Sequence, residues 1–444
     1  MNKEFHKKQN FFSFSDIDSE RKDRIMKFTS TEATPAPHVP PGVLRLTGAA
    51  KEDIPMYRIQ TMNKISPVGL NRFPSELYEV GDAVQDPQGI LVRSAKLLDL
   101  EFNPGLLAIA RAGVGVNNIP LDRCAAAGIP VFSTPGANAN AVKELVICAM
   151  LMGSRDIPGA IRWVREQAAS GADVSTVVEK GKSAFIGPEL YKKTLGIIGL
   201  GAIGSIVANT AISLGMDVYG YDPFLSVDTA LRLDRHVHVV KDINDLYKRS
   251  DYITMHIHYT EKTAHMIDAS AIAAMKRGVR VINLARGEIV DDEAMLTALD
   301  TGMVAAYITD FPNNRLLTAP HVIAMPHLGA STPESEQNCA AMAVDTLRDY
   351  LESGNIRSSV NLPEMTMDRS GVQRLCVLHK NVPGMLANIT SLFGRDGVNV
   401  ENLSNKSRGD YAYTMVDLGS KVGDNVIEDV RRTANVIRVR SLEW

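Results

Sequence analysis

The chain of 444 residues is longer than a single hydrophobic core usually supports, so we expect two to four domains. Hydrophobic residues make up 45% and charged residues 22% of the sequence, which is typical of globular proteins and too apolar for disorder along most of the chain. The 48 basic and 51 acidic residues leave a net charge of -3, which excludes a global electrostatic attraction to nucleic acid or to an anionic membrane. No apolar run approaches the roughly 18 to 20 residues that a membrane span needs.

The four cysteines are scattered along the chain and form no CxxC pair or metal-binding spacing: Cys124, Cys148, Cys339 and Cys376. We therefore expect no metal site, and reduced, buried thiols in a protein that works in the cytoplasm.

Residues 1–55 differ in composition from the rest of the chain. They are polar and charged, and the proline-rich stretch PAPHVPP at residues 35–41 favours an extended linker. We expect a disordered extension or linker, or a start codon assigned too early, and leave its role open. Acidic residues such as Asp16 and Glu20 are unusual in transit peptides, so a targeting sequence is the less favoured interpretation.

From residue 57 to about 360, short β-branched runs alternate with helical patterns. We expect strands at residues 57–65, 90–92, 107–110, 195–198, 217–220, 252–255 and 280–282, and helices such as 139–152 and 291–299. This alternation predicts parallel sheets with right-handed crossovers, and hence doubly wound α/β domains. Residues 361–370 (NLPEMTMDRS) have no periodicity and are predicted to form a linker.

Residues 371–444 follow a smaller pattern of their own. We expect a strand at 373–379, a helix at 385–395, strands at 399–404 and 411–417, a helix from residue 424 and a final strand at 436–441. The order βαββαβ predicts a small separate domain with a ferredoxin-like fold.

Residues 194–204 (TLGIIGLGAIG) contain the pattern GxGxxG directly after an apolar strand and at the start of a helical stretch. Gly199 allows the tight turn, Gly201 lets a pyrophosphate approach the backbone, and Gly204 lets the helix pack closely on the strand. Asp222 ends the next strand, where its carboxylate can accept hydrogen bonds from ribose hydroxyls and repels a 2′-phosphate. The pattern predicts NAD rather than NADP at a helix N-terminus, and glycines needed only for packing are the alternative.

Two polar motifs follow later strands of the same unit. Arg286 lies in INLARG, residues 282–287, and His327 lies in MPHLGAST, residues 325–332. Ligands of an open α/β sheet bind outside the carboxyl ends of the strands, where both residues are expected. An arginine can bind a carboxylate or ketone oxygen with two hydrogen bonds, and a histidine can take a proton from an alcohol as hydride leaves its carbon. We predict that Arg286 and His327 are catalytic.

Residues 57 to about 355 resemble the D-2-hydroxyacid dehydrogenase family, through the motifs RAGVGVNNI (111–119), TPGANANAVKEL (134–145), GLGAIG, INLARG and PHLGAST. The resemblance implies that Arg286 binds the carboxylate and carbonyl of the substrate and that His327 is the general acid/base. It also implies a flavodoxin-like substrate-binding domain made of residues 57–133 and 330–360, and an inserted Rossmann domain for NAD at 134–329. The cofactor-binding residues are then Gly199, Gly201, Ala202, Ile203, Gly204, Asp222, Ala285 and Asp310.

The chain departs from the family in one place. Family members usually carry a glutamate that pairs with the catalytic histidine, and the matching stretch here, ITDFPNNR (308–315), holds Asn314 or Arg315 instead. Either His327 is less basic than its family counterpart or another acid orients it. The candidate acids are Glu334, Glu336 and Asp310, and Asp310 alternatively matches the family's aspartate that holds the nicotinamide amide.

Within the family, the sequence looks most like the members that act on 3-phospho-D-glycerate, at the entry to serine biosynthesis. Arg93 and Ser94 resemble the loop in which these enzymes hold the substrate's phosphate, and binding of a backbone carbonyl or helix end by Arg93 is the alternative. The loop that contains Gly115, Val116 and Asn117 is expected to present N–H groups to the carboxylate. Asn138 matches a family asparagine beneath the site, or it is only a helix N-cap.

Residues 379–386 (HKNVPGML) resemble the HxNxPGxL signature of ACT regulatory domains. The resemblance implies an L-serine effector bound between paired domains by His379, Asn381 and Asn399, and a homodimer or homotetramer. A purely structural role for this domain is the alternative.

We therefore expect NAD-dependent oxidation of 3-phospho-D-glycerate to 3-phosphohydroxypyruvate, with a small-molecule substrate and with no nucleic-acid or membrane partner. A glyoxylate/hydroxypyruvate reductase or another member of the family is the first alternative. An NAD-sensing interaction protein is the second.

Overall fold

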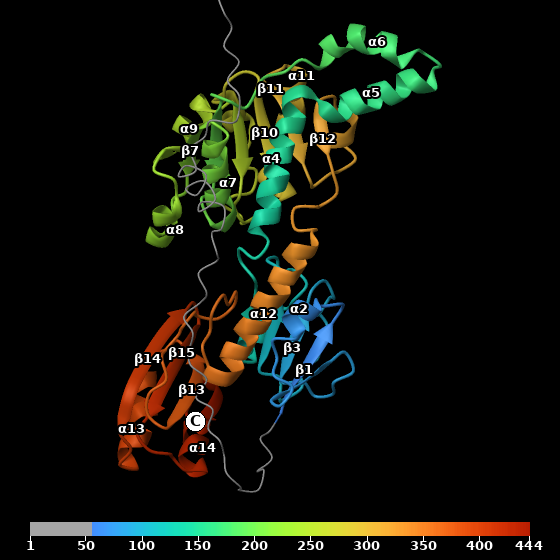
Figure 1. Cartoon of the computed structure of the whole chain (residues 1–444). Coiled ribbons are helices and arrows are strands. Elements are labelled where there is room, and N and C mark those ends of the chain that lie inside the picture. Colours follow the sequence, from blue (N-terminus) through green and yellow to red (C-terminus); the bar gives the residue numbers. More distant parts are fainter. Residues whose placement is uncertain (1–55) are drawn as a thin grey trace, which may run out of the picture. The chain divides into compact units, whose positions relative to one another are not determined.

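The computed structural model describes residues 56–444, and the predicted extension at residues 1–55 lies outside this range. The strands of the described residues form three separate sheets, each with its own helices (Figure 1). No helix among these residues is long and apolar enough to span a lipid bilayer.

The first sheet has five parallel strands in the order β2-β1-β3-β4-β5, which is the order of flavodoxin-like doubly wound sheets. Its strands are β1 (Tyr57–Met62), β2 (Tyr78–Gly81), β3 (Gly89–Val92), β4 (Ala108–Arg111) and β5 (Val131–Phe132). The short helices α2 (Pro67–Leu70) and α3 (Leu121–Ala126) connect them.

The long helix α12 (Pro333–Ser353) comes from much later in the chain but packs into the core of this first sheet. Val344 and Leu347 are fully buried in the same hydrophobic cluster as Ile59 and Leu91. Figure 1 shows α12 beside α2, β1 and β3. The first sheet and α12 thus form one packed unit made from two distant parts of the sequence.

The second sheet has seven parallel strands in the order β12-β11-β10-β9-β6-β7-β8, the Rossmann order with one additional strand. The strands are β6 (Thr194–Ile198), β7 (Asp217–Tyr221), β8 (Val237–Val239), β9 (Tyr252–Met255), β10 (Val279–Asn283), β11 (Val304–Thr309) and β12 (Val322–Ala324). All four residues of β9 are buried, because hydrophobic clusters cover both faces of the sheet.

The helices of this second unit are α4 (Ala139–Arg155), α7 (Ala202–Ser213), α8 (Val227–Arg232), α9 (Ile243–Arg249), α10 (Ala269–Ala273) and α11 (Asp292–Asp300). Helices α5 (Ile157–Ala169) and α6 (Val174–Gly181) continue from α4 and extend beyond the sheet (Figure 1). Short 3-10 turns lie at Lys182–Phe185, Gly287–Ile289 and Leu316–Thr318.

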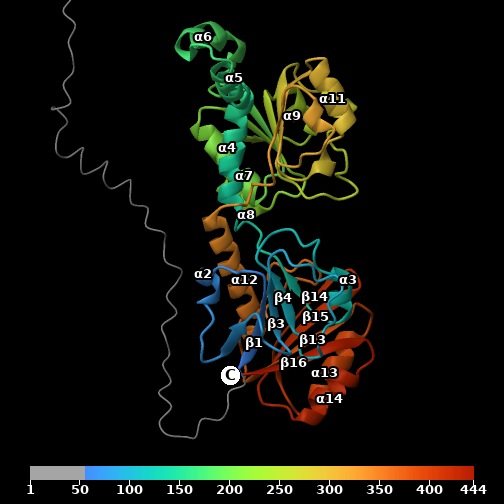
Figure 2. The same cartoon turned by 90° about the vertical axis from the view of Figure 1, so that its right-hand side faces the viewer.

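The third sheet is antiparallel, with the order β14-β15-β13-β16. Its elements are β13 (Gln373–Lys380), α13 (Met385–Arg395), β14 (Val400–Arg408), β15 (Tyr411–Leu418), α14 (Asp424–Arg432) and β16 (Val436–Glu443). Both helices lie on one face of the sheet (Figure 2). The predicted fold class, two doubly wound units followed by a ferredoxin-like βαββαβ unit, is therefore confirmed.

The stretch predicted as a linker, residues 361–370, has no helix or strand but is well packed. Leu362, Met365 and Met367 are buried in the core of the first sheet, and the Asn361 side chain accepts a hydrogen bond from the backbone N–H of Val131 at 2.9 Å. The same core contains Cys376, Leu378, Tyr413, Met415 and Leu442 of the third sheet. The apolar residues of this stretch fill a core that the first and third sheets share. Because they have no helical or strand periodicity, the sequence pattern alone does not distinguish such a packed segment from a linker.

Three of the four cysteines are buried, and burial raises the pKa of Cys124 to about 12. The expectation of buried thiols is wrong for Cys148, which lies on an exposed face of α4. None of the four forms a disulfide.

Candidate active site

The loop between β6 and α7 has the geometry that its three glycines predict. Gly199 has a φ of +90°, and a side chain there would lie 2.5 Å from the carbonyl oxygen of His256. A side chain at Gly204 would collide with the carbonyl oxygen of Gly199. Gly201 has no heavy atom within 4 Å of where its Cβ would be, so the space above it is open. A pyrophosphate fits this open space, beside the free N–H groups of Ala202 and Ile203 at the start of α7.

Asp222 follows β7 and links this loop to the next one. Its Oδ2 accepts a hydrogen bond from Leu200 N at 2.9 Å, and its Oδ1 accepts one from Phe224 N at 2.8 Å. Each carboxylate oxygen can accept more than one hydrogen bond, so both remain able to accept from ribose hydroxyls.

Arg286 follows β10, in a turn held by a residue that the sequence analysis did not single out. Asn283 is fully buried, and its side chain donates to the Arg286 carbonyl at 2.8 Å and accepts from the Ala285 N–H at 3.2 Å. The Arg286 Nη1 in turn donates to the Ala285 carbonyl at 2.6 Å. The asparagine in INLARG was the available signal, because a buried polar side chain at a strand end usually holds a turn.

A second arginine joins Arg286 at the loop after β4. A side chain at Gly115 would lie 3.1 Å from Arg286 Nη2 and 3.6 Å from Arg111 Nη1, so both guanidinium groups reach the same glycine. Burial, followed by the charges of Arg286 and Arg93, lowers the pKa of Arg111. Arg111 is the first residue of the motif RAGVGVNNI, and this role was not predicted from the sequence. Two guanidinium groups at one loop have the charge and the donors to bind an anion.

Arg93 and Ser94 follow β3 and connect to the same cluster. The Arg111 Nε donates to the Arg93 carbonyl at 3.0 Å. The Arg93 Nη2 donates to Glu336 Oε1 at 2.6 Å, so its side chain binds a carboxylate rather than a backbone carbonyl. Ser94 is exposed, and its N–H donates to Asn63 Oδ1 at 3.1 Å.

The remaining predicted residues of this loop lie close to that cluster. Val116 is half-buried and Asn117 is exposed. The neighbouring Asn118, which was not predicted, donates through its Nδ2 to the Ala95 carbonyl at 2.7 Å and ties the two loops together.

His327 lies in the exposed loop between β12 and α12, against an aromatic ring. Its imidazole centroid is 4.6 Å from that of Phe311, with 51° between the planes. The Arg286 guanidinium carbon is 6.0 Å from the centroid of the same Phe311 ring. The two predicted catalytic residues therefore both lie near Phe311, which the sequence analysis did not select.

Among the three candidate acids, Asp310 interacts with His327. Its carboxyl is buried, Oδ2 accepts a hydrogen bond from Gly329 N at 3.3 Å, and Oδ1 has no partner within residues 56–444. Burial raises the pKa of Asp310, and the nearby His327 opposes this rise. Glu336 instead pairs with Arg93. Arg315, one of the two residues that could match the missing glutamate, has its Nη2 3.4 Å from Glu293 Oε1.

Asn138 precedes α4, but its side chain makes no capping hydrogen bond. Its Oδ1 is buried and without a partner among the described residues. This leaves the oxygen available to a ligand, since buried polar atoms are usually hydrogen-bonded.

The predicted effector residues lie at the end of β13 and after α13. His379 is buried, with Nδ1 2.8 Å from the Lys380 carbonyl oxygen and Nε2 2.8 Å from Thr414 Oγ1. Asn381 and Asn399 are exposed and donate to the Gly409 carbonyl at 3.1 Å and to Glu401 Oε1 at 2.9 Å. Of the three, the two asparagines are the accessible ones.

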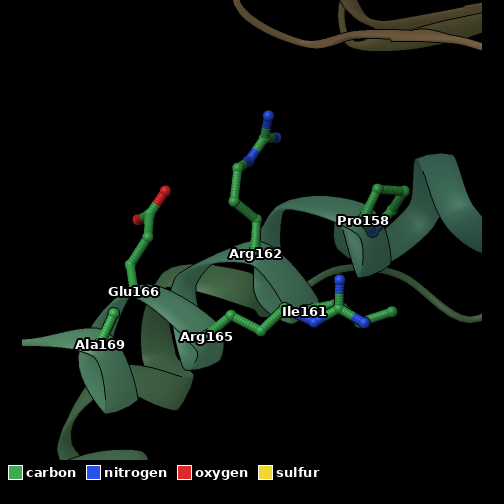
Figure 3. Close-up of a pocket in the computed structure, with 6 residues that line it drawn as sticks. All are labelled: Pro158, Ile161, Arg162, Arg165, Glu166 and Ala169. Atoms are coloured by element: carbon green, nitrogen blue, oxygen red, sulfur yellow. The ribbon is translucent and has the colours of Figure 1, made fainter.

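Two cavities lie on the second unit. One, of about 570 Å³, is lined by residues of α5 alone and by none of the candidate site residues (Figure 3). The other, of about 600 Å³, reaches Gly287 and Phe311 and so borders the candidate site. In the part of the chain that the structure describes, no group of three or more His, Cys, Asp or Glu side chains could hold a metal ion.

Known proteins match both the sequence and the fold. Residues 147–329 match the NAD-binding domain of the D-isomer specific 2-hydroxyacid dehydrogenases. D-3-phosphoglycerate dehydrogenase of Haemophilus influenzae is 31% identical over 379 residues, covering 82% of this chain and 88% of the relative. The enzyme of the same name from Synechocystis is 36% identical over 326 residues, covering 71% of this chain. The chain spans only 56% of that relative's length.

Among solved structures, the NAD+-bound 3-phosphoglycerate dehydrogenase of Entamoeba histolytica is 26% identical, with a TM-score of 0.54, and the match covers 69% of this chain and 99% of that one. D-mandelate dehydrogenase of Rhodotorula graminis shares the fold, with a TM-score of 0.60 at 21% identity over 71% of this chain and all of that one. With a relative that is 31% identical and 88% covered, the chain belongs to the D-isomer specific 2-hydroxyacid dehydrogenase family.

Proposed function

We propose that this chain is an NAD-dependent dehydrogenase that oxidises 3-phospho-D-glycerate to 3-phosphohydroxypyruvate, the first step of serine biosynthesis. The observation that carries the proposal is the pair of guanidinium groups of Arg111 and Arg286 at the Gly113–Gly115 loop. Arg93 joins this pair through its backbone carbonyl, which accepts a hydrogen bond from Arg111 Nε. The substrate has a carboxylate at one end and a phosphate at the other, and three guanidinium groups match its charge. The relatives named D-3-phosphoglycerate dehydrogenase, from Synechocystis and Haemophilus influenzae, support the same proposal.

Arg286 orients the reacting end of the substrate. Its guanidinium reaches the Gly115 loop, so a carboxylate bound there can accept hydrogen bonds from Arg286 and from the loop N–H groups. Arg111 adds a second positive charge at the same place. Two such contacts would hold the carboxylate, and with it C2 and its hydroxyl, in one orientation.

His327 is the general base in the proposed oxidation. A ring nitrogen of His327 takes the proton of the C2 hydroxyl, and Phe311 and Asp310 limit the orientations of the ring. NAD, when bound, accepts the hydride from C2. Gly199, Gly201, Gly204 and Asp222 hold this cofactor in the proposal, with Ala202, Ile203 and Ala285 beside it.

At the far end of the substrate, Arg93 and Ser94 bind the phosphate. Arg93 brings a permanent charge and Ser94 a hydroxyl donor. Asn138 Oδ1, buried and without a partner among residues 56–444, is proposed to accept a hydrogen bond from the substrate.

The three units have separate roles in this proposal. Residues 57–133 and 330–360 bind substrate, residues 134–329 bind NAD, and residues 371–444 form an ACT domain. This domain binds L-serine through the exposed Asn381 and Asn399, with the buried His379 in the adjoining strand β13. We also propose that the chain works in the cytoplasm. A homodimer or homotetramer is proposed as well, and exposed apolar side chains beyond the second sheet, such as Ile161 and Ile186, support such an association.

The test is NADH oxidation by the purified full chain with 3-phosphohydroxypyruvate, hydroxypyruvate or glyoxylate, with and without millimolar L-serine. We expect a strong preference for the phosphorylated acid, and loss of about 10² to 10⁴ in kcat for His327→Ala. Inhibition by serine would support the assignment of residues 371–444 as a serine-binding ACT domain. Turnover that serine does not change would mean that these residues have another role. Binding of NAD without turnover of any acid would indicate an NAD-sensing protein instead.

A glyoxylate or hydroxypyruvate reductase is the second candidate. The observation in its favour is the ion pair of Arg93 with Glu336. In this pair the Arg93 guanidinium, which a substrate phosphate would have to bind, already has an anionic partner. Turnover of the unphosphorylated acids alone would favour this candidate.

A further inference from the structure

The arginine proposed to bind phosphate is already bound to a carboxylate of its own chain. Arg93 Nη2 and Glu336 Oε1 are 2.6 Å apart, although 243 positions separate the two residues in the sequence. Both side chains are partly exposed, at 39% and 44%. The pair is therefore accessible to a dissolved anion.

The two elements that carry this ion pair are held rigidly. Arg93 directly follows β3, and Glu336 lies in the first turn of α12, whose N-cap Thr332 accepts a hydrogen bond from Ser335 N at 3.1 Å. Leu91 of β3 and Leu347 of α12 are fully buried in one core. The backbones therefore keep the two residues opposite each other, and only their side chains need to rotate for the pair to open.

The balance of charge gives Glu336 a specific effect on a phosphorylated substrate. Arg93, Arg111 and Arg286 bring three positive charges. A substrate with a carboxylate and a phosphate brings between two and three negative charges near neutral pH. Glu336 adds one further negative charge directly at Arg93, so a phosphate that approaches this arginine is repelled by Glu336 and must replace its hydrogen bond.

We propose that Glu336 is a specificity-determining residue that holds Arg93 in the empty site and gives it up to the phosphate of the substrate. This inference rests on the proposed function. When inorganic phosphate binds, Arg93 only exchanges the carboxylate of Glu336 for another anion. The net binding free energy of inorganic phosphate at Arg93 is therefore small. A substrate that is also held through its carboxylate at Arg286 has a second attachment, and this second contact offsets the opening of the ion pair. The pair thus selects against small anions that lack the carboxylate.

The test uses Glu336→Gln, which keeps the shape and an acceptor oxygen but removes the charge. We expect KM for 3-phosphohydroxypyruvate, and the dissociation constant of inorganic phosphate measured by phosphorus NMR, to fall by about three- to tenfold. kcat and the KM for hydroxypyruvate should stay within about twofold. A general disturbance of the fold would change the binding of phosphorylated and unphosphorylated ligands alike, so it would not produce this difference between them.

Asp345→Asn is the matched control, because Asp345 lies on the same helix and forms an equally exposed ion pair with Arg72 at 2.6 Å. It should change neither KM nor the affinity for inorganic phosphate. Unchanged or weaker phosphate binding by Glu336→Gln would overturn the inference. The phosphate titration needs no turnover, so it gives this answer even if the wild-type chain proves not to prefer the phosphorylated acid, which would count against the proposed function alone.

Discussion

The imidazole of His327 packs against the ring of Phe311, with 4.6 Å between the ring centroids. The guanidinium carbon of Arg286 lies 6.0 Å from the same ring centroid. The two residues proposed to be catalytic thus lie beside the same aromatic side chain, which follows Asp310 just after β11.

Removal of this ring should impair the chemical step rather than binding. We expect Phe311→Ala to lower kcat by about tenfold, or 1.4 kcal/mol, because the imidazole loses the surface that limits its rotation. Phe311→Tyr keeps the ring and should retain most of the wild-type kcat. Steady-state kinetics with both variants checks this, and an unchanged kcat in Phe311→Ala would show that the contact has no role in catalysis.

Asp310 should make stability depend on pH in a defined direction. Burial raises the pKa of its carboxyl, so the folded chain favours the neutral form and a charged Asp310 destabilises it. This destabilisation is absent below about pH 4, the ordinary pKa of aspartate, and grows as the pH rises through the folded-state value.

Asp310→Asn should therefore raise Tm by about 2–4 °C at neutral pH, and the difference from wild type should vanish near pH 4. Activity should fall in the same variant, because the negative charge near His327 is lost. Thermal unfolding across this pH range is the measurement. A lower Tm for the variant at neutral pH would mean that the charged carboxylate stabilises the fold.

The glycine loop offers a variant that separates folding from cofactor binding. Gly201 has a φ of −67° and no neighbour within 4 Å of its Cβ position, so Gly201→Ala should fold as the wild type does. The added methyl group would occupy the space proposed for the pyrophosphate and weaken NAD binding by at least about tenfold. Fluorescence titration with NADH tests this, with Gly394→Ala in α13 as a control of equally open surroundings. Equal NADH affinity in both variants would place the pyrophosphate elsewhere.

The C-terminal unit contains a fully buried ion pair. Arg374 donates to both carboxylate oxygens of Asp417, at 2.6 and 2.7 Å, and also to the carbonyls of Ser353, Met367 and Asp368. Asp417→Asn would leave a buried guanidinium without its counter-charge and should lower the free energy of unfolding by about 3–5 kcal/mol. Glu443→Gln, which breaks the exposed pair with Lys421, should cost less than about 1 kcal/mol. Urea denaturation of the two variants would show this contrast, and equal losses would refute it.

Much of the fold could be predicted because its signals are local. The GxGxxG turn, the buried run of β9 and the βαββαβ order all lie in short stretches of sequence, and the strand and helix positions agree with the structure to within a few residues. The first strand was predicted too long, since it ends at Met62, before Asn63 adopts a φ of +70°. The pattern of apolar residues continues to Ile65 and does not indicate the left-handed conformation at Asn63 that ends the strand.

The missing parts of the site depend on contacts between distant segments. Arg111 acquires its role only because Arg286 reaches the same glycine, and Glu336 only because α12 packs beside β3. Neither residue has a sequence neighbour that would indicate such a partner. For the same reason, Leu362 in the predicted linker could not be recognised as a core residue.

The most direct test of the account is the ratio of kcat/KM for 3-phosphohydroxypyruvate to that for hydroxypyruvate, measured for the wild type and for Arg93→Ala. Arg72→Ala, which removes an exposed arginine outside the site, is the control. We predict a wild-type ratio far above one. The ratio should fall by at least about tenfold in Arg93→Ala, because Arg93 is proposed to bind the phosphate through charge-assisted hydrogen bonds, and it should be unchanged in Arg72→Ala. A wild-type ratio near one, or a ratio that Arg93→Ala leaves unchanged, would contradict it.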